Sequence, residues 1–414
     1  MCRLRRLGPI GMISVIIAKP TKLCNADCSY CSSPPDGSKA WGDAELETLF
    51  KALEGNVTSS GSVIWHGGEP MLMGPDFYYR AWEIAQKYTP GLKFSLQSNL
   101  LLYKSKLWKD LFTNVFKGSV STSYDPDETQ RTIKGSTTKY NNQFFRKLDE
   151  VMADGFNPLV IGTFTEQTSD LMHLMYDKSI ERANPYHIRL NYCSPVGREA
   201  GAGLLIEPEL YGAKLIEIYD RWIDDVPGFV VTPLDLMLGK VLGLEGERCP
   251  WTRRCGGSFL GVMPNGDIYN CGDFSDVSED WRYGNIFAGT YTPARQAVNF
   301  YKKTDVTNII PAMLGSPAAV QIKRREALQP LDCQTCRHFA ECQGGCVRDV
   351  VLYDRGIGGK FMYCRSWKMV FDHIKTSILN GRADRMIQWL GKNPDVARTH
   401  LHAISSDDDL LRWS

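Results

Sequence analysis

The stretch KPTKLCNADCSYCSSPP, residues 19–35, holds Cys24, Cys28 and Cys31 in the spacing C-x3-C-x2-C. Three thiolates are one fewer than a closed zinc site needs, and the nearest histidine is His66. Three cysteines on a four-iron cluster leave one iron open to an outside ligand, and such clusters span potentials of roughly −700 to +450 mV. The spacing therefore indicates a cluster suited to one-electron chemistry, and a structural zinc site or a disulfide fits it less well.

The composition is that of a globular enzyme and excludes several other classes. A chain of 414 residues with 43% hydrophobic residues can form two or three domains with a sizeable core. A net charge of +1 gives no general electrostatic reason to bind nucleic acid or a membrane surface. No stretch approaches the roughly twenty apolar residues of a membrane span. We therefore expect no nucleic-acid partner and no membrane partner.

The thirteen cysteines argue for cluster or metal ligation rather than disulfides. Their number is odd and their spacings are clustered. The basic start (Arg3, Arg5 and Arg6) leads through an apolar run into the cysteine loop without a cleavage site, so we expect no signal peptide. A reducing cytoplasm fits this usage, and we predict a cytoplasmic location.

Strand-like apolar runs alternate with helical patterns between residues 12 and 192. The predicted strands are 12–18, 62–65, 92–96, 118–123, 159–164 and 187–192. The predicted helices are 46–53 with Asp43 as N-cap, 77–87, 105–114, 140–154 and 169–182. Six strand–helix units predict a parallel sheet with right-handed crossovers. The cysteine loop follows the first strand, so it should lie at the C-terminal mouth, where such folds build active sites.

The cysteine loop and the motif WHGGEP at 65–70 together resemble the radical S-adenosylmethionine (SAM) superfamily. The resemblance implies a partial (β/α)6 TIM-like barrel with a 4Fe-4S cluster on the three loop cysteines. It also implies that the GGEP motif holds the amino group of SAM and that an aromatic residue packs near the adenine. The residues that it places around SAM are Tyr30, Gly67, Gly68, Glu69, Pro70, Asn99, Ser123, Asp125 and Arg131.

Residues at the end of the predicted fourth strand have implied roles of their own. By the resemblance, Ser123 and Asp125 would face the ribose and carboxylate of SAM, and either Arg131 or Lys134 would pair with that carboxylate. We prefer Arg131 because a guanidinium offers bidentate geometry. His66 either is a buried core residue or faces the substrate.

A second cysteine group begins at Cys255 with the pattern C-x10-G-x4-C…C-x2-C-x5-C-x3-C…C. This pattern resembles the SPASM domain, a C-terminal extension of many radical SAM enzymes, and Asn265–Gly266 would form its hairpin turn. With Cys249, the resemblance implies two auxiliary 4Fe-4S clusters, and so three clusters in all. Auxiliary group I would be Cys249, Cys255, Cys271 and Cys346, and auxiliary group II would be Cys333, Cys336, Cys342 and Cys364.

Two structural zinc ions are the alternative occupants of these eight cysteines. The three sets account for eleven of the thirteen cysteines and leave Cys2, as incidental, and Cys193, as a small buried residue. The predicted domains are the barrel at 1–204, a bridging helical segment at 205–245, the SPASM domain at 246–370 and a helical tail at 371–414.

The resemblance implies reductive cleavage of SAM to a 5′-deoxyadenosyl radical, which removes hydrogen from a substrate carbon. Two auxiliary clusters suggest a net oxidation, which also needs a base. Asp273 is the candidate, because sulfatase-maturing relatives carry an aspartate directly after the cysteine that matches Cys271. Here Gly272 is inserted, and His66 stands where that subgroup has glutamine. Both departures count against formylglycine formation, and a turn carboxylate is the other interpretation of Asp273.

We therefore predict a maturase that cross-links a ribosomally made precursor peptide, with a cyclophane-type carbon–carbon bond as first choice and a thioether as second. The alternatives are an anaerobic sulfatase-maturing enzyme and a non-catalytic iron–sulfur or zinc scaffold. An external donor of the flavodoxin or ferredoxin type would supply electrons.

The start of the chain leaves no room for a leader-binding domain, so the peptide would dock on the barrel, the tail or a separate adaptor. The basic insert at about 300–330 is a candidate contact for an acidic leader, or else a solvated face. Its basic residues are Lys302, Lys303, Lys323, Arg324 and Arg325.

Overall fold

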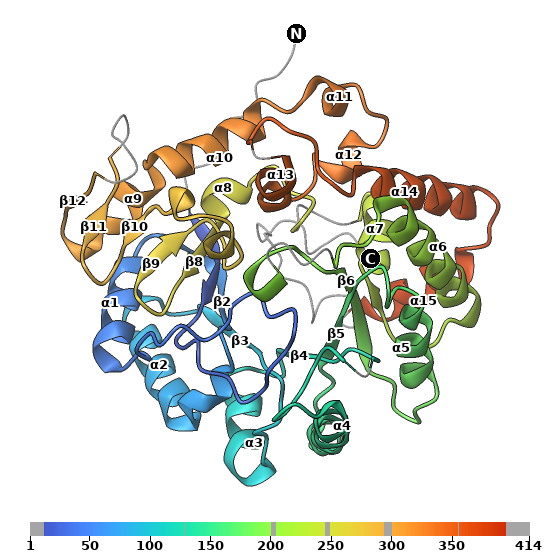
Figure 1. The fold of residues 1–414 in the computed structure, drawn as a ribbon, viewed down its shortest axis with the longest axis horizontal. Coiled ribbons are helices and arrows are strands. Elements are labelled where there is room, and N and C mark those ends of the chain that lie inside the picture. Colours follow the sequence, from blue (N-terminus) through green and yellow to red (C-terminus); the bar gives the residue numbers. More distant parts are fainter. Residues whose placement is uncertain are drawn as a thin grey trace.

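A twelve-stranded sheet organises the chain and curls into a partial barrel (Figure 1). The computed structural model describes residues 12–127, 129–199, 204–244, 249–293, 300–354 and 356–394. Cys2, the basic start and residues 395–414 of the predicted tail lie outside these ranges. Among the described residues the strand order is β12-β11-β10-β9-β8-β1-β2-β3-β4-β5-β6-β7.

All six predicted strands are present, and each pairs in parallel with its neighbour along the chain. They are β1 (Ile13–Ala18), β2 (Val57–Trp65), β3 (Lys93–Gln97), β4 (Val120–Ser123), β5 (Leu159–Phe164) and β6 (His187–Tyr192). β2 begins five residues before the predicted start, because its early residues, Thr58 to Ser60, are polar and give no apolar signal. β4 begins two residues later than predicted, because Gly118 has a φ of 77°, which no extended strand accommodates.

The predicted helices cover the outside of the barrel strands (Figure 1). They are α1 (Asp43–Leu53), α2 (Pro75–Tyr88), α3 (Ser105–Asn114), α4 (Thr137–Ala153) and α5 (Leu171–Ile180). The predicted N-cap of α1 is wrong by one residue, since Gly42 is the cap and Asp43 is already helical. The carboxylate of Glu45 accepts a hydrogen bond of 2.8 Å from the Gly42 N–H, so the third helical residue satisfies the cap.

The bridging segment adds a strand that periodicity did not predict. It consists of α6 (Pro208–Asp225), β7 (Val231–Thr232) and α7 (Leu234–Val241), and β7 pairs in parallel with β6. Two residues are too few to show an alternating pattern, so only the pairing reveals this strand. Tyr219 and Trp222 of α6 are fully buried.

The cysteine-rich region continues the barrel sheet, because β8 (Phe259–Val262) pairs in parallel with β1. β9 (Asp267–Tyr269) folds back on β8 as the predicted hairpin, in which the Gly266 N–H donates to the Met263 carbonyl at 2.9 Å. Three short strands extend this edge: β10 (Gly284–Asn285), β11 (Thr290–Tyr291) and β12 (Lys302–Lys303).

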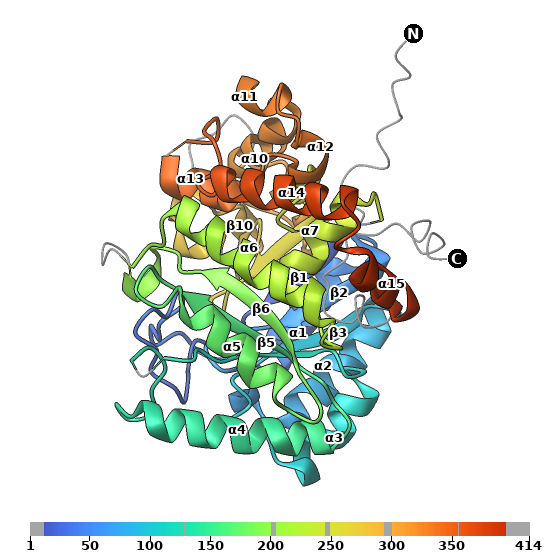
Figure 2. The same cartoon turned by 90° about the vertical axis from the view of Figure 1, so that its right-hand side faces the viewer.

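Eight helices of the described chain also belong to this region and to the tail, and the longest of them, α14, packs against the bridging segment. The helices are α8 (Cys255–Ser258), α9 (Ile309–Leu314), α10 (Pro317–Ala327), α11 (Leu331–Gln334), α12 (Phe339–Cys342), α13 (Val347–Asp354), α14 (Cys364–Leu379) and α15 (Asp384–Lys392). α14 lies along α6 (Figure 2), where the hydroxyls of Tyr219 and Ser377 share a hydrogen bond of 2.7 Å. Over the ranges that the structure describes, no helix is both long and apolar enough for a membrane crossing.

Candidate active site

The cysteine loop after β1 is held in place by the GGEP segment after β2. The N–H groups of Gly68 and Glu69 donate to the carbonyls of Thr21 and Leu23 at 2.9 and 2.8 Å. A Cβ on Gly67 or on Gly68 would stand 2.3 Å from one of these carbonyl oxygens. Both positions therefore require glycine. These glycines let the GGEP segment lie directly against the backbone of the cysteine loop.

Glu69 ties the ends of β2 and β3 together beneath this loop. Its side chain is 1% exposed and accepts hydrogen bonds from the Ser98 hydroxyl at 2.7 Å and from the Met71 and Asn99 N–H groups at 2.8 Å. Burial raises the pKa of Glu69 to about 7, although these hydrogen bonds oppose the rise. Asn99 reaches the loop itself, because its side-chain amide donates to Asn25 at 2.7 Å. Contact of Glu69 with SAM stays a prediction.

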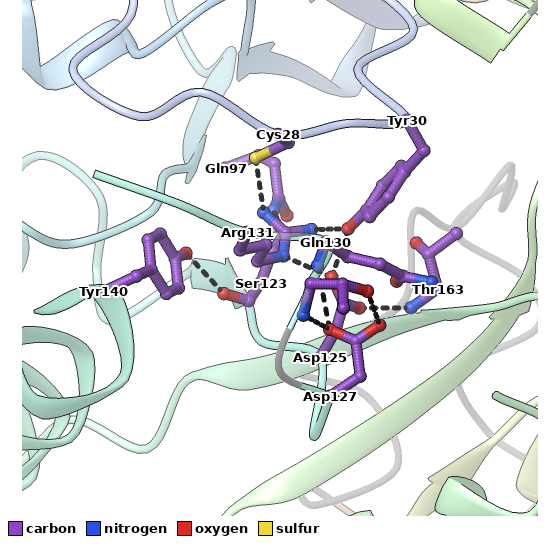
Figure 3. Close-up of polar contacts among 11 residues, drawn as sticks. Cys28, Tyr30, Gln97, Ser123, Asp125, Asp127, Gln130, Arg131, Tyr140 and Thr163 are labelled. Atoms are coloured by element: carbon purple, nitrogen blue, oxygen red, sulfur yellow. Dashed lines mark hydrogen bonds and ion pairs between the residues drawn. The ribbon is translucent and has the colours of Figure 1, made fainter. Parts of the chain in front are cut away.

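Three residues predicted to surround SAM meet at Asp125, just after β4 (Figure 3). The Asp125 carboxylate accepts from the Tyr30 hydroxyl, from Arg131 Nε at 2.6 Å and from the Thr163 N–H at 2.7 Å. Arg131 also donates to the Tyr30 hydroxyl, and its Nη1 lies 3.8 Å from Cys28 Sγ. The arginine is therefore a direct link between the fourth strand and the cysteine loop.

The environment of Arg131 supports its choice over Lys134. Burial would lower the pKa of Arg131, but the charge of Asp125 raises it well above its ordinary value, so the guanidinium stays charged. Lys134 is exposed in a turn with a φ of 51°.

Two further residues of the predicted SAM set, Ser123 and Pro70, have contacts within the barrel. The Ser123 hydroxyl accepts a hydrogen bond of 3.0 Å from the side-chain amide of Gln97, which ends β3. The carbonyl of Pro70 accepts a hydrogen bond of 2.6 Å from the hydroxyl of Tyr78 in α2. These contacts fix both residues at the strand ends, and their contact with SAM stays a prediction.

The cysteines of auxiliary group I come together from three parts of the chain, around residues 249–255, 271 and 346. Cys249 interacts electrostatically with each of Cys255, Cys271 and Cys346. Burial raises the pKa of Cys271 to about 12, so these thiols become thiolates only where a cation compensates the charge. The Asn270 amide donates to Cys255 Sγ at 3.0 Å, a hydrogen bond that favours the thiolate.

The cysteines of auxiliary group II line one pocket. Phe339 and Trp367 are among the other residues that line it. Within the described ranges, no three His, Cys, Asp or Glu side chains stand close enough to hold a single metal ion.

The candidate base Asp273 faces cationic neighbours from both halves of the chain. Arg348 Nη2 lies 3.9 Å from its carboxylate, and 65% of the Asp273 side-chain surface is accessible. Desolvation by the surrounding protein would raise the pKa of Asp273, but the charges of Arg348 and Lys19 lower it below its ordinary value. The carboxylate is thus ionised and accessible.

The inserted Gly272 lies directly against β1. A Cβ there would stand 2.7 Å from the side chain of Ile17, and its carbonyl accepts a hydrogen bond of 2.8 Å from Lys19 Nζ. His66 is near enough to Lys19 and Asp273 to interact with both charges. Burial lowers the pKa of His66 to about 4, and its Nδ1 accepts from the Gly67 N–H at 2.8 Å. His66 is therefore neutral, with its proton on Nε2.

Sequence reasoning missed several charged residues of this region. Arg348 lies 3.0 Å from the buried Asp349, which accepts a hydrogen bond from the hydroxyl of Tyr192 at the end of β6. These contacts join α13 to the barrel. Proximity to ligand cysteines was the available signal, because Arg348 follows Cys346 by two residues and Lys19 precedes Cys24 by five.

The structure also bears on the predictions for the basic insert at 300–330 and for Cys193. Arg325 is 3% exposed and donates to the carbonyls of Ile357 and Gly359, so its predicted contact with a leader is wrong. Lys323 is partly buried and donates to the Leu314 carbonyl at 3.3 Å, whereas Lys302, Lys303 and Arg324 are exposed. Cys193 is buried, as predicted.

A curated sequence relative aligns with nearly the whole chain. The cysteine-type anaerobic sulfatase-maturating enzyme of Clostridium perfringens strain 13 is 25% identical over 386 residues, which cover 89% of this chain and 98% of that protein. No protein-family model matches the chain.

Two solved structures share the fold. The structure of histidine-tagged anSMEcpe with bound AdoMet, which is SAM, superposes with a TM-score of 0.72 at 19% identity and covers 94% of this chain and 99% of that one. SuiB of Streptococcus suis bound to precursor peptide SuiA superposes with a TM-score of 0.57 at 13% identity, covering 86% and 76%. The three-cysteine loop held by a GGEP segment and these likenesses together confirm the predicted resemblance to the radical SAM superfamily, in the subgroup of enzymes with a SPASM domain.

Proposed function

We propose that this enzyme removes two electrons and two hydrogens from a side chain of a peptide or protein substrate. The observation that carries the proposal is the position of Asp273. It follows Cys271 of auxiliary group I, and Lys19 holds its turn against the end of β1, where the cysteine loop begins. A base placed between two predicted cluster sites suits a reaction in which a proton and an electron leave the same intermediate.

The residues present fit the implied cofactors. Cys24, Cys28 and Cys31 would hold the radical cluster, and the Tyr30–Asp125–Arg131 set beside Cys28 would hold SAM. Auxiliary groups I and II would hold two further 4Fe-4S clusters, since the four cysteines of group II line one pocket and Cys249 interacts with the other three cysteines of group I. When bound, these groups supply a 5′-deoxyadenosyl radical for hydrogen abstraction and acceptors for one electron. An external protein of the flavodoxin or ferredoxin type supplies the reducing electron.

The protein's own groups would handle the proton and the substrate. Asp273 takes the proton from the oxidised side chain, and Arg348, 3.9 Å away, orients its carboxylate. The neutral His66 offers an Nε2–H donor toward the same region. Because it can donate without gaining charge, it suits contact with a substrate carbonyl or hydroxyl.

Two oxidations fit this site. Formylglycine formation from a serine or cysteine is supported by the Clostridium perfringens relative, which aligns over 98% of its length. A side-chain cross-link in a precursor peptide, cyclophane first and thioether second, is supported by the inserted Gly272 and by His66, which both depart from the sulfatase-maturing pattern. We place formylglycine formation first, because the alignment spans both predicted domains.

Mass spectrometry distinguishes the two reactions. The anaerobically reconstituted enzyme is coexpressed in turn with a sulfatase and with the short peptides encoded beside its gene. An aldehyde captured by a hydrazide reagent supports formylglycine, whereas a loss of two hydrogens without capture supports a cross-link. Asp273→Asn should retain cleavage of SAM and lose the product. If the fully iron-loaded enzyme leaves every substrate unchanged in mass and forms no 5′-deoxyadenosine, the proposal is wrong.

A further inference from the structure

One layer of the barrel interior runs across four neighbouring strands. Ser123 of β4 pairs with Ile161 of β5, Ile161 pairs with Arg189 of β6, and Arg189 pairs with Thr232 of β7. Paired residues of parallel strands point to the same face of a sheet. The alternate position Leu190 is buried in the core beneath the outer helices. Arg189 and Thr232 therefore face the inside of the barrel.

Arg189 is a half-buried cation without an ionic partner among the described residues. Its Nε donates to Asn191 at 3.0 Å, and no described carboxylate lies within ion-pair distance of its guanidinium. The other cations around the site differ: Arg131 pairs with Asp125 at 2.6 Å, and Arg348 lies 3.0 Å from its neighbouring carboxylate. A guanidinium has five N–H donors, so most of those on Arg189 remain available.

Thr232 is a second polar group in the same layer, and its hydroxyl has no partner within the part of the chain that the structure describes. Its side chain is 1% exposed, and the hydroxyl is buried without a hydrogen bond. Because Thr232 pairs with Arg189 and adjacent strands lie about 4.8 Å apart, the two side chains start from neighbouring positions on the same face of the sheet. Buried polar groups are ordinarily hydrogen-bonded, so an unsatisfied hydroxyl beside an unpaired cation indicates a site for an acceptor that carries negative charge.

The position of Arg189 relates this site to the substrate. Its charge interacts with Cys249 of auxiliary group I and with the candidate base Asp273. The predicted carboxylate-binding residue for SAM, Arg131, follows β4 and is separated from Arg189 on β6 by β5. A substrate at Asp273 would lie within reach of the charge on Arg189.

We propose that Arg189 and Thr232 form an anion subsite inside the barrel, which binds an aspartate or glutamate side chain of the peptide substrate. The inference rests on the proposed function, because it takes the substrate to be a peptide. The guanidinium would donate two parallel hydrogen bonds to the carboxylate, and the Thr232 hydroxyl would donate a third. The subsite would make the enzyme select a peptide with an acidic residue near the residue that it oxidises.

Two short probes test the subsite without any turnover. Acetyl-Gly-Glu-Gly-amide and acetyl-Gly-Gln-Gly-amide are titrated by saturation-transfer NMR into reconstituted enzyme with SAM and no reductant. The wild type should bind the glutamate probe at least about tenfold more tightly, the range of a charge-assisted pair. Arg189→Gln should abolish the preference, Arg189→Lys should retain part of it, and Thr232→Val should reduce it about threefold. The surface variant Arg80→Gln should leave it unchanged.

Three outcomes would overturn the subsite. Equal binding of the two probes by the wild type is the first. The second is an Arg189→Gln variant that keeps the glutamate preference but binds SAM about tenfold more weakly. Arg189 would then bind the carboxylate of SAM and not that of a peptide side chain. The third is an Arg189→Gln variant that keeps the glutamate preference but changes the electron paramagnetic resonance signal of an auxiliary cluster. Arg189 would then be a counterion of that cluster. Failure of the proposed function would appear separately, as a lack of 5′-deoxyadenosine or of modified peptide.

Discussion

Lys19 and Gly272 are 253 positions apart in the chain, yet the Lys19 ammonium donates a hydrogen bond of 2.8 Å to the Gly272 carbonyl. Lys19 is 2% exposed, and its Nζ also lies 3.7 Å from Asp276. This contact connects the start of the cysteine loop to the turn that carries the candidate base Asp273. One buried lysine thus connects the two predicted cluster regions by a hydrogen bond.

Replacement of Lys19 by methionine should lower both the stability of the fold and the yield of product per SAM cleaved. The variant removes a buried ammonium that donates to the Gly272 carbonyl, and the lost charged hydrogen bond should lower the free energy of unfolding by about 1.5–3 kcal/mol. We expect SAM cleavage to continue while product per 5′-deoxyadenosine falls about tenfold, because Asp273 loses its position. Lys109→Met, which removes an exposed ion pair, serves as the control. Unchanged product yield in Lys19→Met would contradict this role.

Replacement of Gly68 by alanine should cost the enzyme its radical cluster. The new Cβ would lie 2.3 Å from the Leu23 carbonyl, so the cysteine loop must move. Iron analysis after reconstitution should fall from about twelve to about eight per chain, since a four-iron cluster uses four irons. Gly358→Ala is the matched control, because a Cβ there meets nothing within 4 Å. Full iron loading of Gly68→Ala would show that the loop tolerates the displacement.

Replacement of Asp125 by asparagine should destabilise the region around Cys28. It leaves the buried Arg131 without its carboxylate, and removal of one partner from a buried ion pair typically costs about 3–5 kcal/mol. Denaturant unfolding should show this loss, and SAM should bind more weakly because Arg131 and Tyr30 lose their common anchor. Arg80→Gln, which breaks an exposed pair with Asp43, should change the unfolding free energy by less than about 1 kcal/mol.

The buried Glu69 should make stability depend on pH. Its pKa is about 7 in the folded protein, against 4.5 for an ordinary glutamate, so between these values the folded state holds a proton that the unfolded state has released. The unfolding free energy of the wild type relative to Glu69→Gln should therefore be highest below about pH 4.5 and should fall as pH rises to 7, with a slope of about 1.4 kcal/mol per pH unit. A difference between wild type and variant that does not vary over this window would refute the shifted pKa.

Local patterns determined most of the barrel and both cysteine groups. The six strands follow from apolar runs, and the predicted division of eight cysteines into two groups agrees with the pocket around auxiliary group II and with the interactions of Cys249. The GGEP segment was likewise predicted from its sequence together with the cysteine loop that precedes it. These features can be predicted because periodicity and ligand spacing are properties of neighbouring residues.

Only the tertiary structure decided which partners those residues have. Gly67 and Gly68 lie against the backbone of the cysteine loop, and Glu69 accepts hydrogen bonds from three residues. β7 exists only because two residues pair with β6, and that pairing brings Thr232 beside Arg189. The contact of Lys19 with Gly272 likewise requires β8 to lie on β1. Such relationships depend on long-range packing, in which the free energy comes from burial shared by distant segments and leaves no local pattern in the sequence.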